Sequence, residues 1–347
     1  MADRIETQVL RVRNIYDDME PLQKAAEILA GGGLVAFPTE TVYGLGANAL
    51  DEKAVAGIFK AKGRPQDNPL IVHVCDLDMI GPLVTEIPEA ALRLAGAFWP
   101  GPLTMIFPKS GAVPQVTSGG LPTVAIRFPA HMVARELIRR ADVPIAAPSA
   151  NLSGSPSPTT AEHCIHDLMG RVDAIVDSGS CGVGVESTVI SLVGETPRVL
   201  RPGGVTVEQL REVLGEVEVD PAVCAPLAEG KAAASPGMKY KHYAPRAHVV
   251  ILEGGRQAFA KYVNARAGDG IYAMCFEEDV PGLSVPSVSY GGEGDDASQA
   301  VRLFAVLRQM DELGAKTVYA HCPARTGVGL AVYNRLLRAA AFEVVRL

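Results

Sequence analysis

The chain has 347 residues, of which 48% are hydrophobic and 20% are charged; this length and composition predict two folded domains and exclude a largely disordered protein. The net charge of −7 argues against a protein that holds free nucleic acid on a broad basic surface, but it leaves room for a small basic pocket. Without an apolar run of ~18 residues or a signal-peptide pattern, the sequence predicts a cytoplasmic protein with no membrane contact.

Helix and strand signals alternate through the first 214 residues. One helix is predicted from about residue 20 to residue 30, where three glycines stop it; a second begins after the N-cap Asp51 and ends before Gly63-Arg64-Pro65. Further helices are predicted at about 88–97, 131–140, 160–169 and 207–214. Short apolar runs predict strands at 34–38, 69–74, 103–107, 123–128, 144–150, 173–179 and 187–193. This alternation predicts an α/β domain over residues 1–214.

The pattern is lost over residues 215–246, which are rich in proline and alanine and are predicted to form a linker. Beyond it, strands are predicted at 248–254, 271–276, 316–322 and 342–347, and helices between them at 256–266, 296–313 and 327–340. Strands separated by helices indicate a parallel sheet, so residues 247–347 are predicted to form a second, smaller α/β domain.

Polar loops follow or interrupt the apolar strands of the first domain. They are rich in Ser, Thr, Gly and Pro and span residues 38–46, 62–69, 127–129, 148–159, 182–190 and 201–204. Ligands of open α/β sheets collect where strands end, so these loops predict a polar binding pocket. Ordinary turn chemistry explains any one such loop, but six of them in one domain favour a site.

Four cations belong to these loops. Lys62 and Arg64 lie at the end of a helix, where a cation offsets the helix dipole. Gly63 and Pro65 also fix the backbone, and a fixed Lys-x-Arg pair in a surface loop suits phosphate and carboxylate. Arg127 interrupts an apolar strand, so its charge must meet an anion supplied by the protein or by a ligand. Arg201, before Pro-Gly-Gly, raises the same question more weakly.

The remaining polar residues do not form a familiar catalytic motif. His73 lies within an apolar strand, where a histidine is more often a satisfied core residue, and Glu40 and Glu186 fit either acid–base groups or loop anchors. The sequence lacks a Walker A loop, a GxSxG elbow, a dinucleotide fingerprint and zinc-ligand spacing. Its six scattered cysteines predict reduced thiols.

The polar loops resemble those of the YrdC/Sua5 family, the threonylcarbamoyl-AMP synthases. The resemblance covers about residues 20–205 and rests on FPTETVYGLGANA, KGRP, LPTVAIRFP, APSANLSG, GVESTVI and LRPG, in this order. SPGMKYKHYAP at 235–245, followed by a small α/β domain, is similar to the longer Sua5 form. The resemblance implies an open, twisted, mixed sheet with helices and a Rossmann-like C-terminal domain.

The resemblance also implies a reaction. L-threonine, bicarbonate (or CO2) and ATP would give L-threonylcarbamoyl-adenylate and pyrophosphate, with Mg2+ accompanying ATP and no dedicated protein cage for the metal. The product would reach tRNA indirectly, through threonylcarbamoyl-transferase proteins that make N6-threonylcarbamoyladenosine. Two alternatives stay open: a module that binds double-stranded RNA or the ribosome, and carbamoyl transfer to another amine.

Site residues follow from the family motifs. Lys62 and Arg64 would neutralise the triphosphate and act as the catalytic cations. The threonine site would comprise Thr41, His73, Arg127, Ala147 and Ser187. The nucleotide site would comprise Arg64, Asn68, Thr123, Ser149, Asn151, Ser157, Arg201 and Tyr243.

The aromatic and basic end of the linker gives a further prediction. Tyr240, Lys241, His242 and Tyr243 would cover the bound nucleotide and exclude water. The alternative is that these residues only pack the two domains together.

Overall fold

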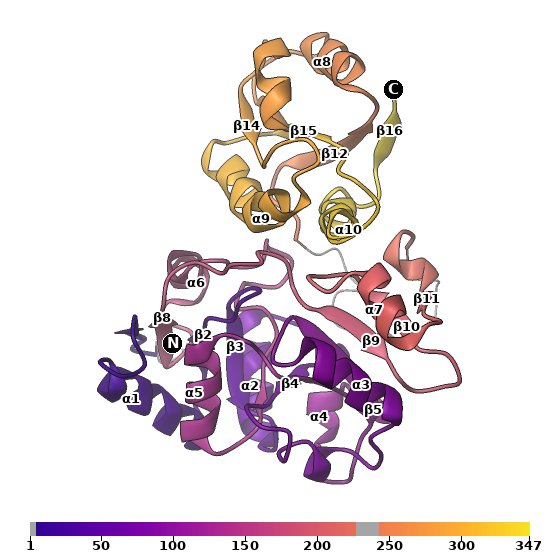
Figure 1. Cartoon of the computed structure of the whole chain (residues 1–347). Coiled ribbons are helices and arrows are strands. Elements are labelled where there is room, and N and C mark those ends of the chain that lie inside the picture. Colours follow the sequence, from indigo (N-terminus) through magenta and orange to yellow (C-terminus); the bar gives the residue numbers. More distant parts are fainter. Residues whose placement is uncertain (1–4, 227–242) are drawn as a thin grey trace.

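The computed structural model describes residues 5–226 and 243–347, which form a larger and a smaller α/β domain (Figure 1). The larger sheet has the strand order β1-β8-β2-β3-β7-β4-β6-β5-β9-β10-β11 and contains both parallel and antiparallel pairs. Its strands are β1 (Gln8–Arg11), β2 (Val35–Phe37), β3 (Gly44–Asn48), β4 (Ile71–His73), β5 (Leu103–Pro108), β6 (Thr123–Arg127), β7 (Ile145–Ala146), β8 (Ala174–Asp177), β9 (Thr188–Ser191), β10 (Arg198–Arg201) and β11 (Glu218–Val219). The predicted α/β class with an N-terminal mixed sheet is confirmed.

Helices cover both faces of the larger sheet. They are α1 (Met19–Ala30), α2 (Glu52–Lys62), α3 (Glu89–Phe98), α4 (Gln115–Ser118), α5 (Met132–Ala141), α6 (Ala161–Leu168) and α7 (Val207–Leu214), with the 3-10 helices η1 (Gly81–Leu83) and η2 (Pro221–Val223). Alternate residues of β2 enter different cores: Val35 and Phe37 pack with α1 and α5, and Ala36 packs with α2. A strand that is buried on both faces has a continuous apolar sequence, as residues 34–38 do.

The sequence pattern missed β3, which lies in a segment predicted to be a loop. Its glycines hid the strand, because glycine weakens the apolar signal while allowing close approach. A Cβ on Gly46 would lie 2.8 Å from both Ile145 and the ring of Phe37. Close packing of the sheet therefore requires glycine at this position, although glycine weakened the strand pattern in the sequence.

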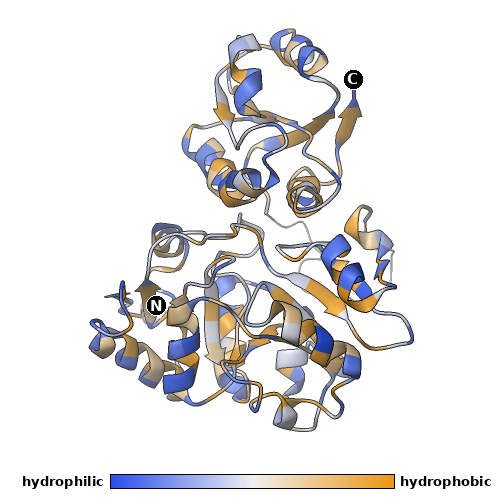
Figure 2. Ribbon diagram, viewed as in Figure 1, coloured by the Kyte–Doolittle hydropathy of each residue, from blue (hydrophilic) through white to orange (hydrophobic). Residues whose placement is uncertain are grey.

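The smaller sheet is parallel throughout, with strand order β14-β13-β15-β12-β16. Its elements are β12 (His248–Glu253), α8 (Arg256–Asn264), β13 (Ile271–Cys275), η3 (Glu277–Gly282), β14 (Ser287–Ser289), α9 (Asp296–Glu312), β15 (Thr317–His321), α10 (Gly329–Ala339) and β16 (Val344–Arg346). Figure 1 shows α9 and α10 on the side facing the larger domain, with α8 on the far side. In Figure 2 the strands are largely hydrophobic, and the helices carry hydrophilic residues on their outer faces.

Two further observations bear on the sequence predictions. Within the predicted linker, β11 pairs with β10 and η2 follows it, so residues 218–223 pack on the larger domain. Among the described residues, no helix is long and apolar enough to span a bilayer.

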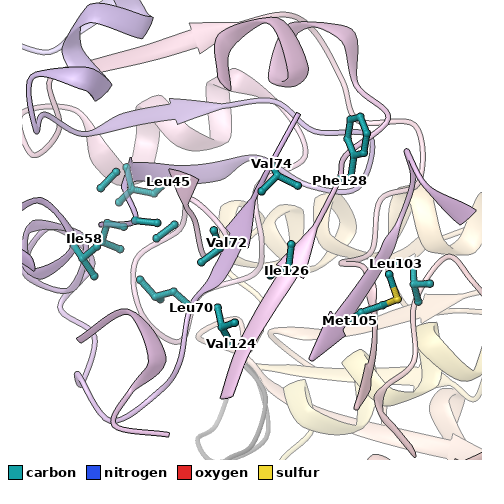
Figure 3. Packing of buried hydrophobic residues seen from close by; sticks show 14 of the residues in the cluster. Leu45, Ile58, Leu70, Val72, Val74, Leu103, Met105, Val124, Ile126 and Phe128 are labelled. Atoms are coloured by element: carbon teal, nitrogen blue, oxygen red, sulfur yellow. The ribbon is translucent and has the colours of Figure 1, made fainter. Parts of the chain in front are cut away.

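Successive side chains of the β4 and β6 segments point alternately into the apolar core and to the opposite face of the sheet. Figure 3 shows Val72 and Val74 of the β4 segment beside Ile126 and Phe128 of the β6 segment, all in one apolar cluster. Because side chains alternate along a strand, the intervening His73 and Arg127 point to the other face. These two residues are register partners on parallel strands.

Candidate active site

Five neighbouring strands in the middle of the larger sheet, in the order β7-β4-β6-β5-β9, bring polar residues together at one end of the strands. His73 ends β4, Arg127 ends β6 and Ser187 immediately precedes β9. Arg127 is also the register partner of Thr104 on β5. The polar loops that were predicted to share a site therefore converge.

These loops enclose a pocket of about 600 Å³, part of which is open to solvent. Ten predicted site residues line it: Thr41, Arg64, His73, Arg127, Ala147, Ser149, Asn151, Ser187, Arg201 and Tyr243. The lining residues that the predicted site did not contain are Thr39, Val42, Gly44, Ile71, Pro148 and Glu186. Glu186 was recognised as an acid–base group or loop anchor, and Thr39, Val42, Gly44 and Pro148 belong to the predicted polar loops. Ile71, inside an apolar strand, carried no signal.

Arg127 has a protein anion as its partner while it also faces the pocket. Its Nη2 lies 2.7 Å from Oε1 of Glu40, and its Nη1 donates to Thr41 Oγ1 at 2.8 Å. Burial alone would raise the pKa of the Glu40 carboxyl, but the charge of Arg127 and hydrogen bonds hold that pKa below its ordinary value. Glu40 is therefore the anchor of Arg127.

His73 is neutral and has a defined tautomer. Burial, reinforced by the charge of Arg127, lowers the pKa of His73 to about 3. Its Nδ1 lies 3.2 Å from the carbonyl oxygen of Ile71, which can only accept, so Nδ1 carries the proton. The Nε2 atom is left as a hydrogen-bond acceptor.

Arg201 and Ser187 form a second polar wall. Arg201 donates from Nε to the carbonyl of Ser187 and from Nη2 to its hydroxyl, both at 3.1 Å. The Ser187 hydroxyl also lies 2.7 Å from Thr104 Oγ1. The guanidinium is therefore fixed before any ligand arrives.

The prediction that Lys62 lies in a surface loop is wrong. Its side chain is only 3% exposed, and Nζ donates to the carbonyl oxygens of Ser149 and Asn151. Burial, followed by the charge of Arg64, lowers the pKa of this amine well below its ordinary value. Lys62 is not among the pocket-lining residues, so it holds the 149–151 loop from behind.

Arg64, two residues further on, behaves differently. It follows the left-handed Gly63 that ends α2, is half-buried and lines the pocket. Long contacts of 3.5 and 3.4 Å from Nη2 to the carbonyls of Asn68 and Pro69 orient it. Within the KGR stretch, the Lys62 side chain thus points into the protein interior and the Arg64 side chain lines the pocket.

Three predicted nucleotide residues lie outside the pocket lining. Asn68 is fully buried, and within residues 5–226 and 243–347 neither its Oδ1 nor its Nδ2 has a hydrogen-bond partner. Thr123 begins β6, at the opposite end of that strand from Arg127. Ser157 is fully buried and donates to Oε1 of Glu186.

Tyr243 joins the pocket to the C-terminal domain. It lines the pocket, is 5% exposed, and packs its ring 5.2 Å from that of Phe304 on α9. The other predicted covering residues, Tyr240, Lys241 and His242, lie outside the described residues.

The pocket is suited to charge neutralisation, because Arg64, Arg127 and Arg201 line it. The carboxylates of Glu40 and Glu186 are both paired with arginines. Over residues 5–226 and 243–347, no cluster of three His, Cys, Asp or Glu side chains is arranged to hold a metal ion. A metal would fit here as part of an anionic substrate complex.

Comparison with known proteins covers nearly the whole chain. The Sua5/YciO/YrdC family, described as "Telomere recombination", matches residues 27–203, and the family "Threonylcarbamoyl-AMP synthase, C-terminal domain" matches residues 205–341. The threonylcarbamoyl-AMP synthase of Pyrococcus abyssi is 45% identical over 98% of this chain and 99% of its own length. That of Bacillus subtilis is 46% identical over 94% of each chain.

A solved structure agrees with these matches. P. abyssi Sua5 complexed with L-threonine superposes with a TM-score of 0.89 at 42% identity, over 98% of this chain and 99% of that one. The resemblance seen in the sequence motifs is thereby confirmed. The chain belongs to the Sua5-type threonylcarbamoyl-AMP synthases, in which a YrdC domain is followed by a C-terminal Sua5 domain.

Proposed function

We propose that this chain joins L-threonine, bicarbonate or CO2, and ATP into L-threonylcarbamoyl-adenylate, releasing pyrophosphate. The observation that carries this proposal is one pocket lined by Arg64, Arg127 and Arg201, by neutral polar groups and by one carboxylate, Glu186, that is paired with an arginine. Such a set suits two anions, a carboxylate and a triphosphate. Family membership favours this synthase over an RNA-binding module or carbamoyl transfer to another amine.

The threonine carboxylate is assigned to Arg127, because that guanidinium is fixed by Glu40 and still faces the pocket. The neutral His73 can accept a hydrogen bond from the ammonium or hydroxyl group without repelling either. Thr41, Ala147 and Ser187 complete this subsite; small side chains there leave room for the substrate.

ATP is assigned to the wall that the remaining polar lining residues form. Arg64 and Arg201 would neutralise the phosphates, while Ser149, Asn151 and Tyr243 would contact the nucleotide. Lys62 supports this wall by holding the 149–151 backbone. Asn68, Thr123 and Ser157 complete the proposed nucleotide set, and the unsatisfied buried amide of Asn68 favours its assignment.

The proposed chemistry requires positioning and charge neutralisation. A neutral threonine amine adds to CO2, and an oxygen of the carbamate attacks the α-phosphorus while pyrophosphate leaves. Fixed guanidinium groups stabilise charge that develops on the phosphoryl oxygens. Mg2+ would enter with ATP and contribute further neutralisation when bound.

We also propose a catalytic domain at residues 1–214 and a C-terminal domain at 247–347. They are joined by the linker 215–246, of which residues 218–223 pack on the larger domain. The product would be used in the cytoplasm by threonylcarbamoyl-transferase proteins that modify tRNA to N6-threonylcarbamoyladenosine.

Incubation with ATP, Mg2+, bicarbonate and each amino acid in turn tests the proposal. Pyrophosphate should form with threonine in a bicarbonate-dependent manner, and mass spectrometry should detect threonylcarbamoyl-adenylate. Pyrophosphate release that is independent of bicarbonate, or equal for all amino acids, would contradict it.

A further inference from the structure

A fully buried arginine of the C-terminal domain reaches the wall of the active site. Arg335 on α10 is 0% exposed, and its Nε lies 2.7 Å from Oε2 of Glu186, 149 residues away along the chain. Its Nη1 donates to the carbonyl of Pro202 at 2.9 Å and its Nη2 to that of Glu186 at 3.3 Å. Both loops that it contacts belong to the larger domain and to the site.

Glu186 would otherwise oppose the substrate, because its carboxylate lines a pocket assigned to a triphosphate. Burial alone would raise the pKa of this carboxyl; the charges of Arg335 and Arg201 and a hydrogen bond from Ser157 together keep that pKa below its ordinary value. Glu186 is therefore ionised, and Arg335 offsets its charge from the side away from the pocket.

The 201–204 loop packs closely on the backbone beside Glu186. A Cβ on Gly203 would lie 2.3 Å from the amide nitrogen of Thr188 and 2.5 Å from the carbonyl oxygen of Glu186. Glycine therefore lets the 201–204 loop lie directly on the Glu186–Thr188 backbone. This packing presents the Pro202 carbonyl to Arg335 and holds Arg201 against Ser187.

The domains also meet closely beside this wall. Gly184 has a φ of 81°, and a Cβ there would lie 2.3 Å from the Cα of Val301 on α9. The loop that carries Glu186 is thus held against the C-terminal domain by close backbone packing at Gly184 and by the ion pair of Glu186.

We propose that Arg335 is a positioning residue for the ATP subsite: it neutralises and orients Glu186, so the nucleotide wall is complete only when the C-terminal domain is docked. This inference rests on the proposed function. It gives the C-terminal domain an electrostatic role in ATP binding without contact between Arg335 and the substrate.

Replacing the arginine and then its partner tests the proposal by charge rescue. Arg335→Met removes the ion-pair partner of Glu186 and leaves it the Ser157 hydrogen bond and the charge of Arg201. The KM for ATP should rise about tenfold or more, while the KM for threonine changes less than about threefold. The double variant Glu186→Gln/Arg335→Met removes both charges and should restore the KM for ATP to within about threefold of wild type. Arg335→Lys keeps the charge without the forked contacts and should raise that KM far less than Arg335→Met.

Arg338→Met is the matched control, because it removes a second α10 arginine that donates across the interface, at 2.8 Å to the carbonyl of Ala222. Its KM for ATP should stay near the wild-type value. Equal ATP affinity in wild type and Arg335→Met, or no rescue in a folded double variant, would overturn the proposal.

Calorimetric binding of ATP keeps this test separate from the proposed reaction. If the wild type binds ATP but forms no threonylcarbamoyl-adenylate, the proposed function fails, and the rescue pattern in ATP affinity still decides the role of Arg335. If Arg335→Met does not fold, a folded double variant with the ATP affinity of wild type supports the charge argument, and one with no ATP affinity refutes it.

Discussion

Lys62→Met should destabilise the protein as well as impair catalysis. Methionine retains most of the apolar stem of lysine but removes the amine that donates to the carbonyls of Ser149 and Asn151. The side chain is 3% exposed, so water cannot readily replace the lost donor. The substitution therefore leaves two carbonyl oxygens without their partner beneath the 149–151 loop.

The size of the effect follows from the two lost contacts. Leaving a buried polar group unsatisfied costs about 1–3 kcal/mol, so with two such carbonyls the free energy of unfolding should fall by about 2–6 kcal/mol. Displacement of the loop by about 1 Å should lower adenylate formation by roughly 10²-fold. Urea denaturation followed by circular dichroism measures the first quantity, and pyrophosphate release measures the second.

Arg64→Ala is the control, since it changes the other cation of the same stretch. Arg64 is half-buried and lines the pocket, so its loss should lower adenylate formation by about 10²-fold or more while the unfolding free energy stays within about 0.5 kcal/mol of wild type. The reasoning fails if Lys62→Met keeps wild-type stability, or if Arg64→Ala loses as much stability as Lys62→Met does.

Three further predictions use the other walls of the pocket. Arg127→Ala should abolish threonine binding but leave ATP binding measurable by calorimetry; unchanged threonine affinity would reassign Arg127 to a purely structural pair with Glu40. The folded-state pKa of His73 is about 3, so below about pH 6.5 the unfolded state binds a proton that the folded state does not bind. The free energy of unfolding should therefore fall by about 1.4 kcal/mol per pH unit as the pH falls toward 3. His73→Asn should reduce this dependence on pH in denaturation curves. Tyr243→Ala should raise the yield of AMP relative to threonylcarbamoyl-adenylate and also lower the melting temperature, because the ring both lines the pocket and packs on Phe304; an effect on melting alone would favour domain packing as its sole role.

Local signals in the sequence were sufficient where a single segment determines its own structure. Asp51 caps α2 by accepting from the amides of Lys53 and Ala54, and Gly63 ends this helix in the left-handed conformation. The parallel C-terminal domain followed from strands alternating with helices. The converging polar loops were also predictable, because ligand sites lie at the ends of strands.

The partners of the buried charges were not predictable from local pattern. The sequence required an anion for Arg127 but could not choose between protein and ligand; the structure supplies Glu40 and leaves the guanidinium on the pocket wall. Lys62 was expected in a surface loop, since a KGR stretch full of cations reads as solvated. Its burial depends on carbonyls 87 and 89 residues away, which no periodicity records.

Net charge was the least informative quantity for this site, because the same residue types serve two roles in an acidic chain. Lys62 and Arg335 are buried, lie outside the pocket lining and donate to protein oxygens, so each organises a loop. Arg64, Arg127 and Arg201 line the pocket, where their charges are available to a ligand. A basic substrate site can therefore exist in a protein of charge −7, since a ligand responds to the few nearby fixed charges while solvent and salt screen the distant ones.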